Sequence, residues 1–227
     1  MLQLDHLVIA AATLADGAAW CERVFGITPA TGGKHAFMGT HNLLFSVACA
    51  RFPNAYAEII AIDPGGTAPA GPRWFGLDAP ALRLALRGGP QLIHWVARSH
   101  DLHATSAAWR ASGIEPGAVV AAERHTANGM LRWQIALRAG GARPLGGALP
   151  TLIEWGAVHP CDALPVSGVQ LDCVQLIGLD EPCLGALGSI NGVACAEPTD
   201  SAPALVATLT GQRGTLALSS LPTDPRP

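Results

Sequence analysis

Two histidines and two glutamates occupy matching places along the sequence. His6 and His94 each lie in an apolar run, and Glu58 and Glu154 each lie in a later apolar run. If these runs are strands, each ionisable group shares a face with apolar neighbours, where a carboxylate is costly unless it is paired or bound to a metal ion. Imidazole and carboxylate groups without a thiolate suit Zn²⁺, Ni²⁺, Co²⁺, Mn²⁺ or Fe²⁺. We therefore predict that the four side chains bind one divalent metal ion in a shared cavity. The alternative is four unrelated residues, with satisfied core histidines and glutamates at strand ends.

Three further residues are candidates for holding a substrate. His35 and His125 begin equivalent His-x-x-x-Gly segments and would line the mouth of the cavity, or else face solvent as turn residues. Arg124 would contact an anionic substrate, or else be solvated like most isolated arginines.

The elements that must position these residues come from an internal repeat. Three apolar runs align without gaps: 3–8, 91–96 and 170–175. Each run suits a strand and is followed by a helical pattern ending in a glycine, which favours the left-handed position after a helix. These glycines are Gly26, Gly113 and Gly192. In the first two copies, further strand-like runs follow, and each copy closes on the strand that holds Glu58 or Glu154. The repeated unit is therefore β-α-β-β-β.

We expect an α+β fold in which the paired modules form a cupped mixed sheet around a cavity. A degenerate third half-module follows, with strands at 204–210 and 215–219 and with Cys173 where the histidines stood. A Gly-, Pro- and Ala-rich connector carries a short helix at 80–86, and the C-terminal tail is expected to be disordered. The predicted boundaries are 1–63 and 88–158 for the modules, 64–87 for the connector, 165–220 for the third module and 221–227 for the tail.

Several segments of the first module resemble a glyoxalase-like domain of the vicinal oxygen chelate superfamily. They are Leu4-Asp5-His6-Leu7-Val8-Ile9-Ala10, Gly26, Gly32-Gly33-Lys34-His35, Gly39-Thr40-His41-Asn42 and Tyr56-Ala57-Glu58-Ile59-Ile60. The resemblance covers roughly residues 2–156 and implies metal ligands on the first and last strands of each module, which match His6, Glu58, His94 and Glu154. This His/Glu/His/Glu set is similar to that of glyoxalase I, whereas extradiol dioxygenases of the superfamily typically use two histidines and one glutamate.

The expected activity is that of a metal-dependent lyase or isomerase acting on a small molecule with vicinal oxygens. A chelated ion would stabilise an enediolate, and Glu58 or Glu154 would move the proton between neighbouring carbons. One alternative is a non-catalytic protein that binds or sequesters a small molecule in the same cavity. A second alternative is an extradiol-type dioxygenase, which would require Fe²⁺ and a two-His-one-carboxylate site.

Composition excludes several classes of protein. The chain has 227 residues, a net charge of −3 and 14% charged residues, which does not favour a nucleic-acid partner. No apolar run approaches the length of a membrane helix, and the N-terminus has no basic segment typical of a signal peptide. The six cysteines show no C-x-x-C pair, so we expect free thiols and a cytoplasmic protein, with a homodimer as an open option.

Overall fold

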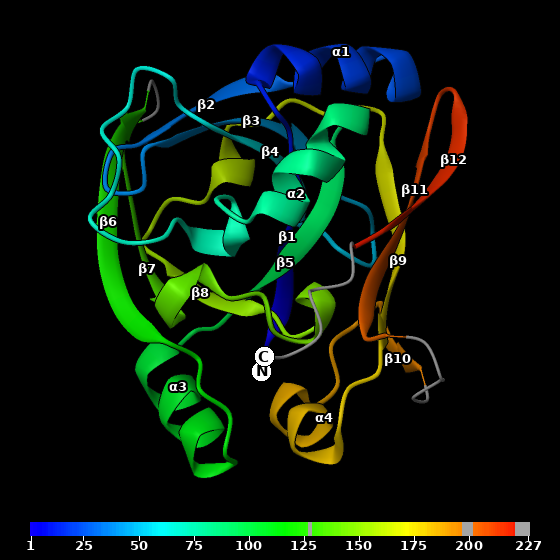
Figure 1. Cartoon of the computed structure of the whole chain (residues 1–227). Helices are drawn as coiled ribbons and strands as arrows, with labels where there is room; N and C mark the ends of the chain where they lie inside the picture. Colours follow the sequence, from blue (N-terminus) through cyan, green and yellow to red (C-terminus); the bar gives the residue numbers. More distant parts are fainter. Residues whose placement is uncertain (127–128, 197–201, 221–227) are drawn as a thin grey trace.

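The strands of both predicted modules form one sheet. The computed structural model describes residues 1–126, 129–196 and 202–220. Eight strands pair in the order β2-β3-β4-β1-β5-β8-β7-β6, and the sheet curls until it is nearly closed like a barrel (Figure 1). These strands are β1 (Gln3–Ala10), β2 (Ala30–His35), β3 (Thr40–Ser46), β4 (Tyr56–Ile62), β5 (Gln91–Arg98), β6 (Ala118–Thr126), β7 (Gly129–Leu137) and β8 (Thr151–Trp155). The predicted α+β class with a cupped mixed sheet is confirmed.

The two modules are related by a local twofold at the centre of this sheet. β1 and β5 pair antiparallel, with His6 opposite Val96 and His94 opposite Val8. Each of these strands leads into a helix, and the remaining three strands of its module follow. The helices of the sheet-forming part of the chain are α1 (Leu14–Phe25), α2 (Pro80–Ala85) and α3 (Leu102–Ala111). The strand–helix repeat predicted from the sequence is therefore present in both modules.

Local capping explains where the two module helices begin and end. The Thr13 side chain accepts a hydrogen bond from the backbone N–H of Asp16, and Gly26 ends α1 at a φ of 73°. Asp101 does the same for α3 by accepting from the backbone N–H of Ala104. These caps fix the strand-to-helix turn of each module and hold the helices against the convex side of the sheet.

Residues of the central strands alternate between two apolar cores. Leu7 and Ile9 belong to the outer core, which α1, α3 and a second sheet cover. Val8 and Ala10 belong to the inner core, on the concave side of the sheet. His6 is two residues before Val8 on β1, so its side chain points to the same, concave side of the sheet.

The connector between the modules fills part of the concave side. Trp74 and Phe75 belong to the inner core and stack on each other with ring centroids 5.2 Å apart. Phe75 holds a φ of 56°, a conformation that a bulky residue adopts only when its surroundings demand it. The short helix expected at 80–86 is α2, with Pro80 in its first turn. The sequence predicts only a connector here, whereas in the structure Trp74 and Phe75 of this segment are part of the inner core.

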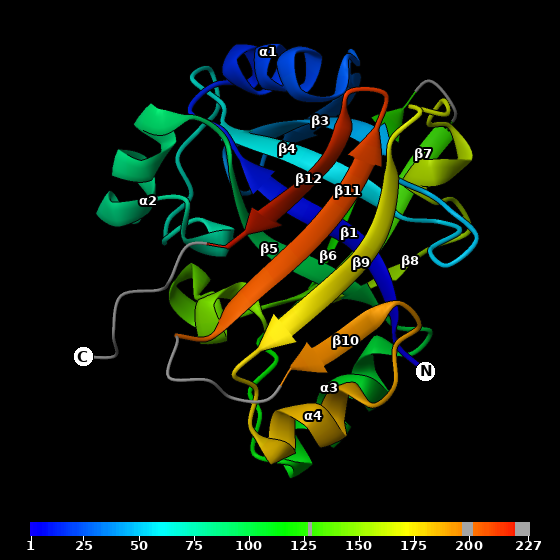
Figure 2. The ribbon, with the colours of Figure 1, turned by 90° about the vertical axis from the view of Figure 1, so that its right-hand side faces the viewer.

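The chain after β8 forms a separate four-stranded sheet in the order β10-β9-β11-β12 (Figure 2). Its elements are β9 (Gln170–Ile177), α4 (Glu181–Leu187), β10 (Val193–Ala196), β11 (Ala204–Gly211) and β12 (Gly214–Ser219). The two strands expected after residue 200 are β11 and β12. The helix, however, ends at Gly188, and Gly192 instead lies close to Phe52, whose ring would be 2.2 Å from an added Cβ.

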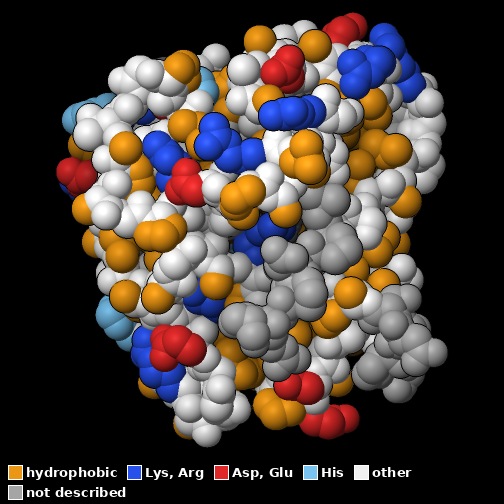
Figure 3. Space-filling view, in the orientation of Figure 1, with side chains coloured by type: hydrophobic (Ala, Val, Ile, Leu, Met, Phe, Trp, Pro, Cys, Tyr) orange, Lys and Arg blue, Asp and Glu red, His pale blue; other side chains and the backbone are white. Residues whose placement is uncertain are grey.

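The sequence also predicts the absence of membrane-spanning helices, an unbiased surface charge and free cysteines. Within the described residues, no helix is long and apolar enough to cross a membrane. On the face shown in Figure 3, acidic and basic side chains lie interspersed. All six cysteines are free. The tail 221–227, expected to be disordered, and residues 127–128 lie outside the described residues.

Candidate active site

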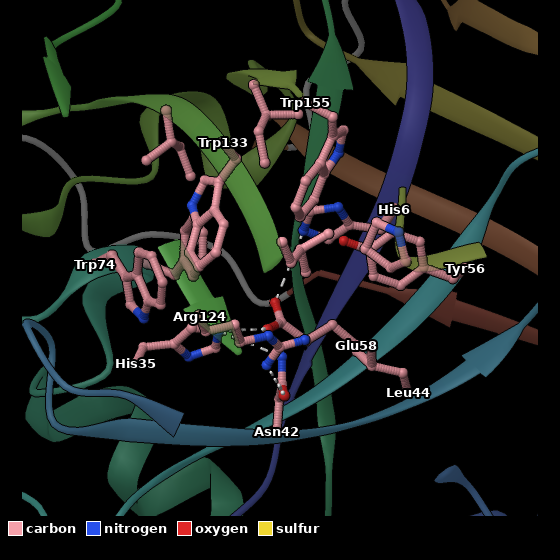
Figure 4. A pocket seen from close by; sticks show the side chains of 15 residues that line it. His6, His35, Asn42, Leu44, Tyr56, Glu58, Trp74, Arg124, Trp133 and Trp155 are labelled. Carbon is pink, nitrogen blue, oxygen red and sulfur yellow. Dashed lines mark hydrogen bonds and ion pairs between the residues drawn. The ribbon is translucent and has the colours of Figure 1, made fainter. Parts of the chain in front are cut away.

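His6 lies between two carboxylates. Its side chain is buried, and its Nδ1 is 2.6 Å from Oδ1 of Asp5. Its Nε2 faces Oε2 of Glu58 at 3.8 Å, and the Tyr56 ring stacks on the imidazole at 4.5 Å between centroids (Figure 4). Neighbouring residues of a strand normally point to opposite faces, but the pairing of β1 with β5 is irregular between Leu4 and His6. This bulge lets Asp5 reach its neighbour.

Asp5 is a fully buried acceptor for three side chains. Besides His6, it accepts hydrogen bonds from Nε1 of Trp155 and from Nε2 of His159, each at 3.0 Å. Burial raises the pKa of the Asp5 carboxyl, but hydrogen bonds from His159 and His6 outweigh it, so the pKa lies well below its ordinary value. An ionised Asp5 makes Nδ1 of His6 the protonated nitrogen. Nε2 of His6 is then free to exchange a proton at the cavity.

Glu58 is held in place by an amide. Its Oε1 accepts a hydrogen bond of 2.6 Å from Nδ2 of Asn42, and Oδ1 of Asn42 accepts one of 2.8 Å from the backbone N–H of Gly33. That second bond fixes which way the amide points. Gly32 makes the arrangement possible, because a Cβ there would lie 2.0 Å from Oδ1 of Asn42. The Gly-Gly pair of the sequence therefore serves the close approach of β2 to this amide.

His35 lies inside the cavity and not at its mouth. Its Nδ1 is 3.1 Å from Oγ1 of Thr40, and its Nε2 is 4.0 Å from Oε1 of Glu58. Burial, followed by the positive charge of Arg124, lowers the pKa of His35 to about 3. His35 is thus a neutral polar group at physiological pH.

Arg124 reaches the site from the opposite edge of the sheet. It lies on β6, and its Nη1 is 3.5 Å from Oδ1 of Asn42, while its buried Nε has no hydrogen-bond partner among the described residues. An added Cβ at Gly33 of β2 would lie 2.3 Å from Nη1 of Arg124, so the two edge strands approach each other here. His125, the next residue, is exposed and does not line the cavity. The structure therefore brings Arg124 to the site and leaves His125 outside it.

These groups surround a small cavity of about 30 Å³, room for one or two water molecules. Its walls are mainly aromatic and apolar (Figure 4). The lining residues are His6, His35, Asn42, Leu44, Tyr56, Glu58, Trp74, Phe75, Arg124, Leu131, Trp133, Ile135, Ile153, Trp155 and Pro160. Polar groups on one side and apolar walls on the other are typical of a small-molecule site, but ligand pockets usually measure roughly 300 Å³ or more, so a substrate would displace side chains around this cavity.

His94 and Glu154 lie elsewhere. His94 is fully buried on the concave side, 3.0 Å from Oγ1 of Thr151, with its ring 5.3 Å from that of Phe75. Glu154 accepts a hydrogen bond of 2.7 Å from the backbone N–H of Leu102, at the start of α3. Neither side chain lines the cavity that holds His6.

Strand register explains the position of Glu154. In the first module, β1 places Val8 opposite Glu58 of β4, and in the second, β5 places Val96 opposite Thr151 of β8. Thr151 is therefore the structural equivalent of Glu58. Glu154 stands three residues further along the strand, and an odd offset puts its side chain on the other face.

The residues present do not fit the predicted four-ligand metal ion. Of the expected ligands, His6 and Glu58 face each other, whereas His94 and Glu154 lie apart from them. In the described part of the chain, no group of three or more His, Cys, Asp and Glu side chains is placed to hold a metal ion. Besides His6 and His35, the neighbours of Glu58 are the Asn42 amide and the Arg124 guanidinium, which act as donors here and do not supply further metal ligands.

We expect His94→Gln and Glu154→Gln to leave the metal content of the purified protein unchanged, because neither side chain reaches the His6–Glu58 pair. Elemental analysis of both variants beside the wild-type protein checks this. A clear fall in bound metal in either variant would support the prediction that the four side chains bind one metal ion.

Acid should destabilise the protein through its buried neutral histidines. Between pH 6.5 and about 3, the unfolded chain protonates His35 while the native chain does not, so stability falls as pH falls. At pH 5 this costs about 2 kcal/mol for one such histidine. His35→Gln should flatten the dependence of unfolding free energy on pH in this window. His125→Gln, which changes an exposed histidine, is the matched control, and equal slopes for both variants would refute the assignment.

Sequence reasoning missed four members of the site. Asp5 and Asn42 lie in segments that carry the resemblance, but the sequence pattern gives neither of them a role. Trp155 and His159 complete the shell around Asp5. The adjacency of Asp5 and His6 was the one signal available, because only tertiary pairing brings the other three to them.

The family model described as glyoxalase-like domain matches residues 4–184. No curated protein matches the chain. A hypothetical protein from Staphylococcus aureus is similar in structure, with a TM-score of 0.59 and 15% identity over 97% of this chain and 88% of that one.

Two methylmalonyl-CoA epimerase structures align less well. The one from Mycobacterium tuberculosis has a TM-score of 0.41 and 17% identity over 71% of this chain and 91% of that one. One from Streptomyces coelicolor, in complex with 2-nitronate-propionyl-CoA, has a TM-score of 0.44 and 16% identity over 70% and 99% of the two chains. Since the family model spans most of the sequence, the chain belongs to the glyoxalase-like domain family.

Proposed function

We propose that the protein is an isomerase or lyase that moves a proton at a carbon next to a carbonyl or carboxylate group of a small, oxygen-rich molecule. The observation that carries this proposal is the buried Glu58 carboxylate facing Nε2 of His6 at 3.8 Å across the cavity. Two groups able to accept or donate a proton thus face the same enclosed space, as general acid–base catalysis requires.

The surrounding contacts support distinct roles for the two groups. The Asp5 carboxylate holds the Nδ1–H of His6, so proton exchange takes place at Nε2. The Asn42 amide holds one oxygen of Glu58 and leaves the other toward His6. In the proposed reaction, Glu58 removes the proton from carbon and Nε2 of His6 donates a proton to a neighbouring atom of the intermediate.

Removal of such a proton leaves negative charge on the neighbouring oxygen. The guanidinium of Arg124 is the cation nearest to Glu58 among the cavity residues and would stabilise that charge. Members of the superfamily often use a divalent metal for this purpose, and the donors here do not form the four-ligand site expected. The proposal therefore assigns the stabilising role to Arg124, and it favours substrates with a carboxylate or an ionisable carbonyl oxygen.

Hydrogen exchange in D₂O tests the proposal without knowledge of the product. The wild-type protein is incubated with a panel of small 2-oxo acids and 2-hydroxy aldehydes, and loss of the proton next to the carbonyl is followed by NMR. For any compound that exchanges, we expect Glu58→Gln to slow exchange by about 10²-fold or more. Glu154→Gln is the matched control and should stay within about twofold, because Glu154 lies outside the cavity.

Two results would contradict the assignment. Equal exchange rates in the wild-type protein and Glu58→Gln would show that Glu58 is not the general base. Binding of panel compounds without any exchange, in the wild-type protein, would favour the non-catalytic binding protein.

A further inference from the structure

A second cavity lies in the other half of the cup. It has a volume of about 50 Å³, and Trp74 and Phe75 line both this cavity and the one that holds His6. The two stacked rings of the connector therefore separate the two spaces. Its lining residues are Met38, Pro72, Trp74, Phe75, Leu137, Arg138, Gly140, Gly141, Ala142 and Thr151.

The polar side-chain groups at this cavity are mostly donors without partners. Both terminal nitrogens of Arg138 are buried and have no hydrogen-bond partner among the described residues, while its Nε donates to the backbone oxygen of Glu115 at 3.0 Å. The indole N–H of Trp74 is likewise buried and unpartnered. No carboxylate is among the described residues that line the cavity.

Positive charge gathers on the same side. Burial, with the charges of Arg138 and Arg143, pushes the pKa of His94 well below its usual range, so that imidazole is neutral. Burial lowers the pKa of Arg138 to about 10, which leaves the guanidinium charged at neutral pH. Arg143 donates to the backbone oxygen of Ile93 and forms no ion pair within the described chain. A buried guanidinium with unmade hydrogen bonds costs several kcal/mol and calls for an acceptor that the chain does not provide.

We propose that this cavity binds a small oxyanion, a carboxylate or an inorganic oxyanion of about three to five heavy atoms, held by Arg138. An anion supplies the missing acceptors, and planar oxyanions match the two terminal nitrogens of a guanidinium. The Glu115 carboxylate attracts Arg138 electrostatically, but it is exposed and accepts its hydrogen bonds from Gly117 and Arg110. A water molecule would supply acceptors but no negative charge. The site is independent of the proposed catalytic reaction, which uses Arg124 on the other side of Trp74.

Thermal unfolding with added acetate tests the site. Sodium acetate replaces sodium gluconate at constant ionic strength, because gluconate carries the same charge but is too large for 50 Å³. We expect a saturable rise in Tm of the wild-type protein, about 3 °C at ten times the dissociation constant. Arg138→Met should abolish the rise. Arg132→Met, which changes an exposed arginine outside both cavities, is the matched control and should retain it. Arg124→Met is measured beside it, because Arg124 is the cation of the first cavity.

Each outcome decides the proposal. No saturable rise in the wild-type protein, or a rise that survives Arg138→Met, overturns it. A rise lost only in Arg124→Met places the anion in the first cavity and also overturns it. If Arg138→Met does not fold, diffraction from wild-type crystals soaked in bromide decides, through an anomalous peak beside the terminal nitrogens of Arg138 or its absence there.

Discussion

Replacing Asp5 by alanine should lower the free energy of unfolding by about 3–5 kcal/mol, the usual cost of breaking a buried charged network by removing one partner. Asp5 is fully buried and accepts hydrogen bonds from His6, Trp155 and His159. Its loss leaves one buried donor, on His6, and two partly buried donors, on Trp155 and His159, without their acceptor. Asp5→Asn keeps an acceptor oxygen and should cost less than the alanine variant.

Urea denaturation at pH 7 measures this effect. Asp16→Ala changes an exposed carboxylate in the first turn of α1 and should cost no more than about 1 kcal/mol. The dependence on pH gives a second readout. Because the pKa of Asp5 is lowered in the native state, its contribution is present above its unfolded value of 3.8 and is lost as pH falls below that value. An Asp5→Ala variant as stable as the wild type would show that the network contributes nothing.

Replacing Trp74 by alanine should also cost about 3–5 kcal/mol, the range for truncating a large buried aromatic side chain. Trp74 is 5% exposed, stacks on Phe75 and contacts the edge of His35 at 4.8 Å between centroids. The substitution removes one of the two stacked rings that line both cavities, so the two spaces should become continuous beside Phe75. We expect the variant to bind an apolar dye that the wild-type protein excludes.

Phe37→Ala is the control for this change. Phe37 packs against Trp74 at 5.3 Å between ring centroids but is 38% exposed, so its loss should cost about 1 kcal/mol. Urea denaturation of both variants at pH 7 checks the difference. A loss below 1 kcal/mol for Trp74→Ala would mean that the connector only covers the cup and is not part of its core.

The duplication left two unequal halves. His6 faces a carboxylate, whereas His94 faces the hydroxyl of Thr151 at the equivalent place. Arginines near His94 take the place of the acidic partners that surround His6. The first half therefore holds the acid–base groups of the proposed reaction, and the second half holds the proposed anion site.

The repeated unit, and the sheet face on which His6 and Glu58 lie, could be predicted from the sequence. Local patterns were sufficient for this, because the capping residues Thr13 and Asp101 and the alternation of apolar residues act over a few positions. For the same reason, His6 and Glu58 could be placed together on the concave side, where the structure has them.

The other residues around the His6–Glu58 pair are placed by contacts between segments far apart in the sequence. Whether Thr151 or Glu154 matches Glu58 depends on the register between β5 and β8, which more than fifty residues of chain separate. The bulge that turns Asp5 toward His6 is likewise set by pairing with β5, and Arg124 arrives because the sheet curls until its two edges meet. Each of these is a contact between distant segments, and a shift of one residue in a strand exchanges the faces, so no local pattern could specify them.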